Sequence, residues 1–386
     1  MTERIAYFDN ASTSFPKPEC VYKFADEFYR TSGVNIGRGQ YSLATKVQKL
    51  IDSTRSSLLD LYCCCNKQVL FTSSATEAIN KILLGLHITE DSNIYLSPFE
   101  HNAVSRVVHA LAHQKNLSVK IIPFDSRTLE INTAELVRDF EKHPPNLVVM
   151  THVSNVCGAI LPVEAVFFQA KKYKAVTVVD MSQSAGLLNL NVSSDDIDYA
   201  VFAGHKTLYA SFGIGGFYCK KDAKLNPIIF GGNGKDSANQ NATGTLVDLI
   251  EVGSQNVYAI ASLYASLMWL MQKGFNWVQL KEEENAKKLL DSLRGHRNIE
   301  IIADEMICAR TGIASTRFLH YSPDEIGNFL NRAGIAVRTG LHCSPYAHRF
   351  LNSSPDGTVR FSISCFTNNE DFIKLNAALA LIENEG

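Results

Sequence analysis

The sequence predicts an α/β fold with a mostly parallel, seven-stranded sheet that is covered on both faces. A smaller α+β domain follows it in the chain. Three observations indicate this. Short β-branched and apolar runs alternate with amphipathic segments, a pattern typical of parallel sheets. Several runs are apolar along their whole length, as expected of strands buried on both faces. Polar residues follow the ends of these runs, where open α/β sheets bind their ligands.

The expected strands are short and rich in β-branched residues. They span residues 68–72, 94–97, 119–123, 147–151, 176–180, 199–203 and 216–219. Amphipathic segments with helical spacing lie between the earlier strands. They span residues 76–86, 102–113, 133–141 and 163–173.

The pattern changes after about residue 253. We expect one long helical stretch over 257–293, with a charged surface near 281–288. Further strands are expected at 299–302, 311–318, 336–338 and 359–364, and helices at 323–333 and 370–383. We therefore predict a large α/β domain over residues 1–256 and a small α+β domain over 257–386. Residues 1–15 are expected to pack on the small domain.

Composition and charge limit the classes of function. Hydrophobic residues make up 46% of the chain, which supports a large core. The formal net charge of −2 excludes the broad basic surface of a general nucleic-acid-binding protein. Nine cysteines, with a run at 63–65, do not suit a disulfide scaffold and favour a reducing compartment. The apolar stretch 258–271 is interrupted by serines and is too short for a bilayer, and the N-terminus lacks an apolar signal core. We expect a cytoplasmic protein without membrane or nucleic-acid partners.

Two charged residues directly follow expected strands. Lys206 comes after the apolar run 199–203, and its amine could form a Schiff base with a carbonyl cofactor. An ordinary lysine reaching solvent is the alternative, because most lysines are exposed. Asp180 ends another apolar strand, where a buried carboxylate needs a cation such as a protonated pyridine nitrogen. Its alternative role is to cap the following turn.

A phosphate site is expected where a strand leads into a helix at residues 71–77. Small hydroxyl residues stand there, and the free N–H groups of a helix start favour an anion. The alternative is plain helix capping, because Ser74 and Glu77 have capping-box spacing. At the next strand end, His101 could stack on an aromatic cofactor ring or be a structural histidine.

Cys343 is the candidate nucleophile. It follows His342 and lies close in sequence to Arg338, and positive neighbours favour the thiolate. A buried, inert cysteine is the alternative. Arg360, on a short expected strand, could clamp a carboxylate or form a structural salt bridge. The spacing of His342, Cys343 and His348 matches no standard zinc pattern, so we expect no metal site.

Together these segments resemble the cysteine desulfurases and selenocysteine lyase-like enzymes of the class V aminotransferase fold. The resemblance runs from Tyr7-Phe8-Asp9-Asn10-Ala11 to the final expected helix. The matching segments are, in order, Ala75-Thr76-Glu77, Glu100-His101-Asn102-Ala103, Ser154-Asn155, Asp180 with Gln183, Gly204-His205-Lys206, Arg338-Thr339-Gly340, His342-Cys343 and Arg360. The short interval from Cys343 to Arg360 resembles the branch with a short cysteine loop, which includes sulfur-mobilising desulfurases and selenocysteine lyases.

The resemblance implies the fold-type I transferase fold and the cofactor pyridoxal 5′-phosphate, bound covalently to Lys206. It implies that His101 stacks on the cofactor ring and that Asp180 holds the ring nitrogen. Gln183 and Asn155 would lie at the ring hydroxyl. These roles come from the family likeness and not from the spacing of the residues.

The resemblance also implies a phosphate site and a homodimer. Ala75 and Thr76, mainly through backbone N–H groups, and His205 would hold the phosphate. Ser254 matches a hydroxyl residue that reaches the phosphate of the neighbouring subunit. Ala75 and Ala203 replace hydroxyl residues that are usual in the family, so the phosphate would depend more on the remaining groups.

The implied reaction removes sulfur from L-cysteine and leaves alanine. Lys206 would move the α-proton, Cys343 would attack the substrate sulfur and become a persulfide, and His101 would assist as a catalytic residue. Arg360, Asn155 and Arg338 would bind the substrate.

Three alternatives stay open for the function. The substrate could be L-selenocysteine, or the reaction could be transamination or another lyase step on a different amino acid. The protein could also be a non-catalytic sulfur carrier. The sequence does not name a sulfur-acceptor protein.

Overall fold

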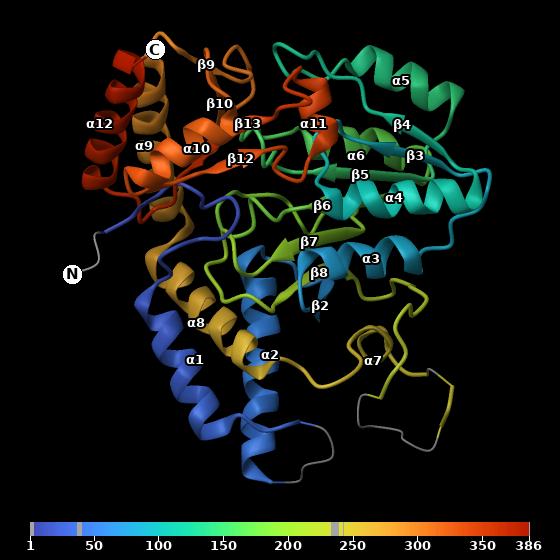
Figure 1. The fold of residues 1–386 in the computed structure, drawn as a ribbon. Helices are drawn as coiled ribbons and strands as arrows, with labels where there is room; N and C mark the ends of the chain where they lie inside the picture. Colours follow the sequence, from blue (N-terminus) through green and yellow to red (C-terminus); the bar gives the residue numbers. More distant parts are fainter. Residues whose placement is uncertain (1–3, 37–40, 233–238, 242, 386) are drawn as a thin grey trace.

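A seven-stranded sheet forms the centre of the molecule (Figure 1). The computed structural model describes residues 4–36, 41–232, 239–241 and 243–385. The strand order is β2 (Lys67–Thr72), β8 (Gly215–Lys220), β7 (Tyr199–Ala203), β6 (Val176–Asp180), β5 (Leu147–Thr151), β3 (Asn93–Leu96) and β4 (Ser118–Ile121). Strand β8 is antiparallel to both of its neighbours, and the other pairs are parallel. The predicted fold class is confirmed, and each expected strand of this sheet lies within two residues of the observed one.

Helices cover both faces of the sheet. On one face α3 (Ala75–Gly85) and α4 (Asn102–Lys115) share a buried cluster with the strands, which includes Val149 and Val178. The adjacent residues Val148 and Val179 belong to the cluster on the opposite face, with α5 (Thr133–Lys142) and α6 (Val163–Lys171). Successive residues of a strand point to opposite faces, so a strand covered on both sides is apolar throughout.

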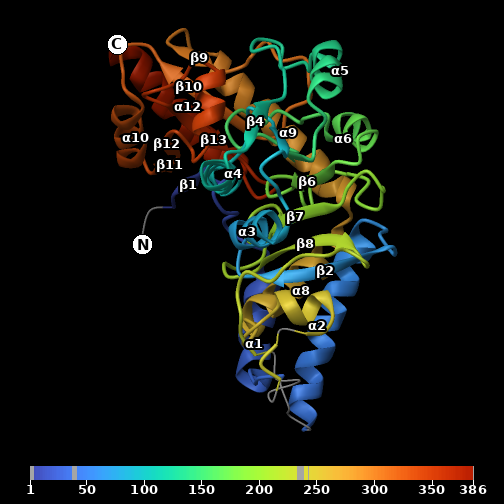
Figure 2. The ribbon, with the colours of Figure 1, turned by 90° about the vertical axis from the view of Figure 1, so that its right-hand side faces the viewer.

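Three helices project together beyond the β2 edge of the sheet (Figures 1 and 2). They are α1 (Glu19–Ser32), α2 (Ser42–Leu61) and α8 (Val257–Lys273), and α8 packs against the other two. Neither α1 nor α2 was among the elements expected from the sequence. The buried residues of α1 are few, namely Val21, Ala25, Phe28 and Ser32, so its apolar stripe is narrow.

The expected long helix over 257–293 is wrong in one respect. The structure has two helices, α8 and α9 (Phe275–Arg294), separated by Gly274. Gly274 has φ of 84° and ψ of 140°, a conformation that essentially only glycine adopts. The glycine therefore ends α8 and lets the chain turn toward the second sheet.

A second, four-stranded sheet carries the C-terminal part of the chain. Its order is β12 (Arg338–Gly340), β13 (Thr358–Ser362), β10 (Ile313–Phe318) and β9 (Ile299–Ile301). The remaining elements are α7 (Leu246–Ile250), α10 (Pro323–Arg332), α11 (Pro345–Phe350) and α12 (Asn369–Glu385). Near the N-terminus, β1 (Ala6–Tyr7) pairs in parallel with β11 (Ile335–Ala336), and Phe8 belongs to the same buried cluster as Phe361.

The domain boundary at 256/257 stays a prediction. Helix α8, on the C-terminal side of that boundary, packs against α1 and α2, whereas α9 packs against α12 and the second sheet. Throughout the described part of the chain, no helix combines the length and apolar character needed to cross a bilayer.

Candidate active site

The predicted site residues line one cavity of about 220 Å³, with a single exception. The cavity lies where β5, β6 and β7 end and where the second sheet and its loops approach them. Its lining includes Ala75, Thr76, His101, Asn155, Asp180, Gln183, His205, Lys206, Arg338, Cys343 and Arg360. Residues more than 280 positions apart in the chain therefore share one site.

Ser254 is the exception. Its side chain is exposed and lines a different pocket together with Ser73, Glu77 and Lys81. The Asn35 amide donates a hydrogen bond to its hydroxyl, with Nδ2 and Oγ 3.3 Å apart. Within one chain Ser254 does not reach the cavity that holds Lys206.

Lys206 stands in a tight turn directly after β7. The backbone N–H of Tyr209 donates to the Lys206 carbonyl over 2.8 Å, and that of Ala210 donates to the Gly204 carbonyl over 2.8 Å. A side chain at Gly204 would place its Cβ 2.7 Å from Ile214, so the turn requires glycine. Burial lowers the pKa of the Lys206 amine to about 8, and the nearby charge of Asp180 partly opposes this effect. A substantial fraction of the amine is therefore neutral and nucleophilic near neutral pH.

Asp180 ends β6 with its carboxylate almost fully buried. Its Oδ1 accepts a hydrogen bond from the backbone N–H of Ser182 over 2.9 Å, so it also organises the following turn. Gln183 donates from Nε2 to the Ala11 carbonyl over 2.7 Å, which ties the N-terminal segment to the site. The hydroxyl of Ser182 is buried and has no partner among the described residues.

His101 serves as the N-cap of α4 and also lines the cavity. Its Nδ1 accepts a hydrogen bond from the backbone N–H of Ala103 over 3.0 Å. Burial, followed by the charge of Lys206, lowers the pKa of His101 to about 4. The ring is therefore neutral at pH 7, with its proton on Nε2 because Nδ1 is an acceptor. The structural and the cavity-lining roles of this histidine coexist.

The start of α3 points its first N–H groups toward the cavity. Ser74 caps the helix by accepting from the N–H of Glu77 over 3.2 Å, as the capping alternative expected. The N–H groups of Ala75 and Thr76 belong to the first turn, where a helix has no internal acceptor for them. Nearby, Nδ1 of His205 is buried without a partner among the described residues. These unpaired donors suit an anionic group.

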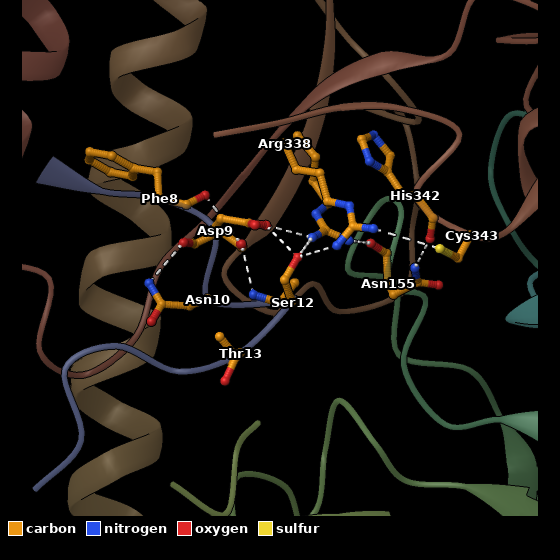
Figure 3. Close-up of polar contacts among 12 residues, drawn as sticks. Phe8, Asp9, Asn10, Ser12, Thr13, Asn155, Arg338, His342 and Cys343 are labelled. Carbon is orange, nitrogen blue, oxygen red and sulfur yellow. Dashed lines mark hydrogen bonds and ion pairs between the residues drawn. The ribbon is translucent and has the colours of Figure 1, made fainter. Parts of the chain in front are cut away.

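An N-terminal segment connects two arginines (Figure 3). Arg360, which is 2% exposed, donates from Nη2 to Asp9 Oδ1 over 2.7 Å and to Ser12 Oγ over 2.8 Å. Its Nη1 donates to the Asn155 carbonyl over 3.0 Å. Arg338 donates from Nη1 to the same Ser12 hydroxyl over 2.7 Å. The expected structural salt bridge exists, and it holds Arg360 at the cavity wall.

The loop that carries Cys343 is held through its backbone and side chains. The Asn102 N–H donates to the Cys343 carbonyl over 2.7 Å, and Asn155 Nδ2 donates to the His342 carbonyl over 2.7 Å. Ser344 Oγ donates to Asn155 Oδ1 over 2.7 Å. His342 and Cys343 have φ of 46° and 58°, so both residues are left-handed. Asn155, expected at a ring hydroxyl, makes its observed side-chain hydrogen bonds to this loop instead.

Arg338 Nη2 approaches Cys343 Sγ to 3.7 Å, and Figure 3 shows this contact. Cys343 is partly exposed, unlike the buried Cys157, Cys219 and Cys365. The thiol is therefore accessible and lies beside a guanidinium.

The cavity fits pyridoxal 5′-phosphate. A buried carboxylate at Asp180 suits a ring nitrogen, and the amine of Lys206 suits an aldehyde. The buried atoms Ser182 Oγ and His205 Nδ1 have no partner among the described residues and are free to bind a further group. Together with the start of α3, they suit the phosphate.

Comparison with known proteins gives the family. The family model described as aminotransferase class-V matches residues 6–375. The chain belongs to the class-V aminotransferase family. It is 28% identical to the cysteine desulfurase of Pectobacterium carotovorum, over 98% of this chain and 93% of that protein. It is also 28% identical to a probable cysteine desulfurase of Aeropyrum pernix, over 97% of this chain and 93% of that protein.

Solved structures show the same fold. The apo structure of a cysteine desulfurase from Thermococcus onnurineus superposes with a TM-score of 0.90 at 24% identity, covering 99% of this chain and 95% of that one. A cysteine desulfurase from Escherichia coli, in an S-sulfonic acid form, gives 0.85 at 23% identity, covering 98% and 94%.

Several residues that line or support this cavity were not predicted from the sequence. Asp9 stands in a segment that carried the family likeness, but no role was assigned to it. Glu100, beside His101, is fully buried, and its Oε1 accepts from the Thr151 N–H over 2.7 Å. Burial raises the pKa of Glu100 to about 8, so it is mostly protonated at pH 7. Ser344 was also missed. In each case the sequence did hold a signal, because the residue is polar and stands next to a segment that was expected to belong to the site.

Proposed function

We propose that the protein is a pyridoxal-phosphate-dependent, cysteine desulfurase-like lyase, which converts L-cysteine to alanine and leaves a persulfide on Cys343. One observation carries the proposal: the Cys343 thiol, beside the Arg338 guanidinium, lines the same cavity as Lys206 and Asp180. The names of the curated relatives support the same activity.

The cofactor would be held by residues on three sides of the cavity. Lys206 would bind it covalently, Asp180 would pair with the ring nitrogen, and His101 would lie against the ring. The N–H groups of Ala75 and Thr76 would hold the phosphate, with His205. When bound, the cofactor supplies an electron sink for negative charge at the substrate α-carbon.

The substrate carboxylate would bind at the arginine pair. Both arginines line the cavity, and the Nε of Arg360 has no hydrogen-bond partner among the described residues. Asp9 and Ser12 fix the orientation of that guanidinium, and Asn155 would border the bound substrate. A guanidinium held at the cavity wall suits a planar carboxylate.

Lys206 and Cys343 would carry the proton and sulfur steps. The neutral Lys206 amine accepts the α-proton of the substrate. The Cys343 thiolate attacks the substrate sulfur, forming a sulfur–sulfur bond as the carbon–sulfur bond breaks. The electron pair of the broken bond stays with carbon, and protons complete the methyl group and the α-carbon of alanine. Arg338 would hold the thiolate before attack.

Cys343→Ser tests the proposal. Wild-type protein with cofactor and dithiothreitol is expected to release equal amounts of alanine and sulfide from L-cysteine, and the variant is expected to lose at least about 10²-fold in rate because its nucleophile is gone. Cofactor absorbance should persist in Cys343→Ser and lose its normal form in Lys206→Ala. Cys308→Ser, a partly exposed cysteine outside the cavity, is the matched control and should keep full activity.

Parallel assays separate the alternative substrates. Turnover of L-selenocysteine but not L-cysteine would make the protein a selenocysteine lyase. Unchanged activity of Cys343→Ser on another amino acid would remove the thiol from the mechanism and contradict the desulfurase proposal.

We also propose a cytoplasmic homodimer in which Ser254 reaches the phosphate bound by the neighbouring subunit. Its exposure and its distance from its own chain's cavity support this arrangement. Light scattering should give twice the chain mass, and Ser254→Ala should weaken cofactor retention on dialysis. A monomer that retains cofactor equally in both forms would contradict this part of the proposal.

A further inference from the structure

A second hollow lies on another side of Cys343. It is a groove of about 610 Å³ between α4 and the loop that leads into α11. Arg338, His342 and Cys343 line both this groove and the 220 Å³ cavity that contains Lys206. The nucleophilic sulfur therefore stands between the site where sulfur would be loaded and a wider, separate hollow.

The groove carries positive charge without compensation. Arg106 of α4 and Arg349 of α11 are exposed, and Arg338 stands beside the sulfur. In the part of the chain that the structure describes, no Asp or Glu lines the groove, and no hydrogen bond or ion pair engages the Arg106 or Arg349 side chain. Arg349 lies 5.3 Å from the ring centre of Tyr346, a stacking contact that keeps its charge at the groove.

The sulfur cannot easily move to meet a distant acceptor. The carbonyls of His342 and Cys343 are hydrogen-bonded to Asn155 and Asn102, which belong to the sheet side of the site. The Ser344 N–H also donates to the Leu341 carbonyl over 2.9 Å. A short loop held at several points keeps Cys343 in place, so an acceptor must come to it, and the groove is the wider of the two hollows that Cys343 lines.

We propose that this groove docks an acidic polypeptide segment of a sulfur-acceptor protein, with carboxylates flanking the acceptor cysteine. This inference rests on the proposed desulfurase function. The partly buried Leu341, Pro345 and Tyr346 offer an apolar floor for several residues of extended chain, while Arg106 and Arg349 face carboxylates. Charge complementarity of this kind mainly raises the rate of productive encounter.

The transfer step needs no oxidant. The acceptor thiolate attacks the terminal sulfur of the Cys343 persulfide, and a new sulfur–sulfur bond forms on the acceptor. The original sulfur–sulfur bond breaks, and its electron pair leaves with Cys343 as a thiolate, which Arg338 stabilises. The proton of the acceptor thiol is released to water.

The experiment measures transfer from the loaded holoenzyme. Persulfide formed from labelled L-cysteine is mixed with synthetic peptides of equal length that carry one cysteine flanked by Asp and Glu, by Lys and Arg, or by Ser. We expect the acidic peptide to react about tenfold or more faster than the basic one, and the difference to shrink with added KCl.

Charge reversal gives the decisive comparison. The double variant Arg106→Glu with Arg349→Glu should reverse the preference and favour the basic peptide. Arg138→Glu on α5, also an exposed arginine without a partner in the described chain, is the matched control and should keep the wild-type preference. Alanine formation with dithiothreitol, a small neutral thiol, should be unchanged in every variant and verifies folding.

Other outcomes overturn the inference. Equal rates for the three peptides, or no effect of the double reversal, would remove the groove from acceptor recognition while leaving the desulfurase function intact. Glutathione reacting faster than the acidic peptide, with the same dependence on Arg106 and Arg349, would assign the groove to a small anionic thiol. Wild-type protein that forms neither alanine nor persulfide would overturn the proposed function and this inference together.

Discussion

At the residue scale, side chains in this site combine a structural contact with a place on the cavity wall. His101 caps α4, Asp180 organises the turn after β6, and Arg360 pairs with Asp9, yet all three line the cavity. A structural role and a functional role are therefore compatible in the same residue. A buried polar group needs a partner, and that partner also fixes the direction in which the remaining atoms point.

Ser344 gives the prediction at this scale. Ser344→Ala removes its hydrogen bond to Asn155 and should loosen the loop of Cys343, so persulfide formation should fall about tenfold while the cofactor spectrum stays unchanged. Removing a buried hydrogen-bond partner also costs about 1–3 kcal/mol of stability. Rapid-quench measurement of persulfide at saturating L-cysteine checks the rate.

Ser353→Ala is the control for that prediction. Ser353 is also buried and bonds His348 Nδ1 over 2.7 Å, and its hydroxyl makes no hydrogen bond to Asn155 or Cys343 among the described residues. It should lose similar stability but keep the rate of persulfide formation. Equal loss of rate in both variants would show that Ser344 contributes only to general stability.

At the scale of elements, burial explains which expectations were accurate. Strands β5 and β7 are buried at every position, and their predicted ends match the structure. Helices α1 and α2, which pack largely on α8, were not predicted, although the buried residues Val47, Ile51, Thr54 and Leu58 of α2 recur at helical spacing. The division of the expected long helix depends on one backbone conformation at Gly274, and the apolar pattern continues across it.

Gly274→Ala tests the importance of that break. A side chain there meets no atom within 4 Å, so any cost comes from the backbone conformation and not from a clash. We expect a loss of about 1–3 kcal/mol in the free energy of unfolding, measured by urea titration. Gly295→Ala is the matched control, because Gly295 has φ of −65° and should tolerate alanine. Similar stability of the two variants would contradict this explanation of the break.

At the scale of the whole molecule, buried polar contacts join the two sheets behind the cavity. Glu282 of α9 accepts a hydrogen bond from the Tyr209 hydroxyl over 2.9 Å, and that hydroxyl lies 3.3 Å from Cys365 Sγ. Tyr209 follows β7 of the large sheet, and Cys365 follows β13 of the small one. Burial raises the pKa of Glu282 to about 7. The protonation state of this carboxyl is therefore coupled to the stability of the contact between the two sheets.

This linkage predicts a dependence of stability on pH. The folded-state pKa of Glu282 lies above its ordinary value, so its protonated form stabilises the fold fully at low pH. That contribution falls as the pH rises from about 4.5 toward and through about 7, with a limiting slope of about 1.4 kcal/mol per pH unit. Glu282→Gln should therefore lose stability less steeply than wild type between pH 5 and pH 8 in urea titrations.

Glu283→Gln is the control at the neighbouring, exposed position of α9. It should keep the pH dependence of wild type. Glu100, whose pKa is raised to about 8 by burial, adds a similar decrease that begins near pH 4.5 and runs through about pH 8, and both variants retain it. A Glu282→Gln profile parallel to wild type would show that this carboxyl is not linked to folding.

The sequence by itself determined the α/β class, the strands of the central sheet and the polar residues that end them. These follow from local periodicity, because a strand buried on both faces must be apolar and its end must be polar to meet a ligand. Only the tertiary structure decided that Asp9 and Ser12 orient Arg360, that Asn155 holds the Cys343 loop, and that Arg106 lines the same groove as Cys343. Such contacts join residues hundreds of positions apart, and no local pattern records which distant partner will satisfy a buried donor or charge.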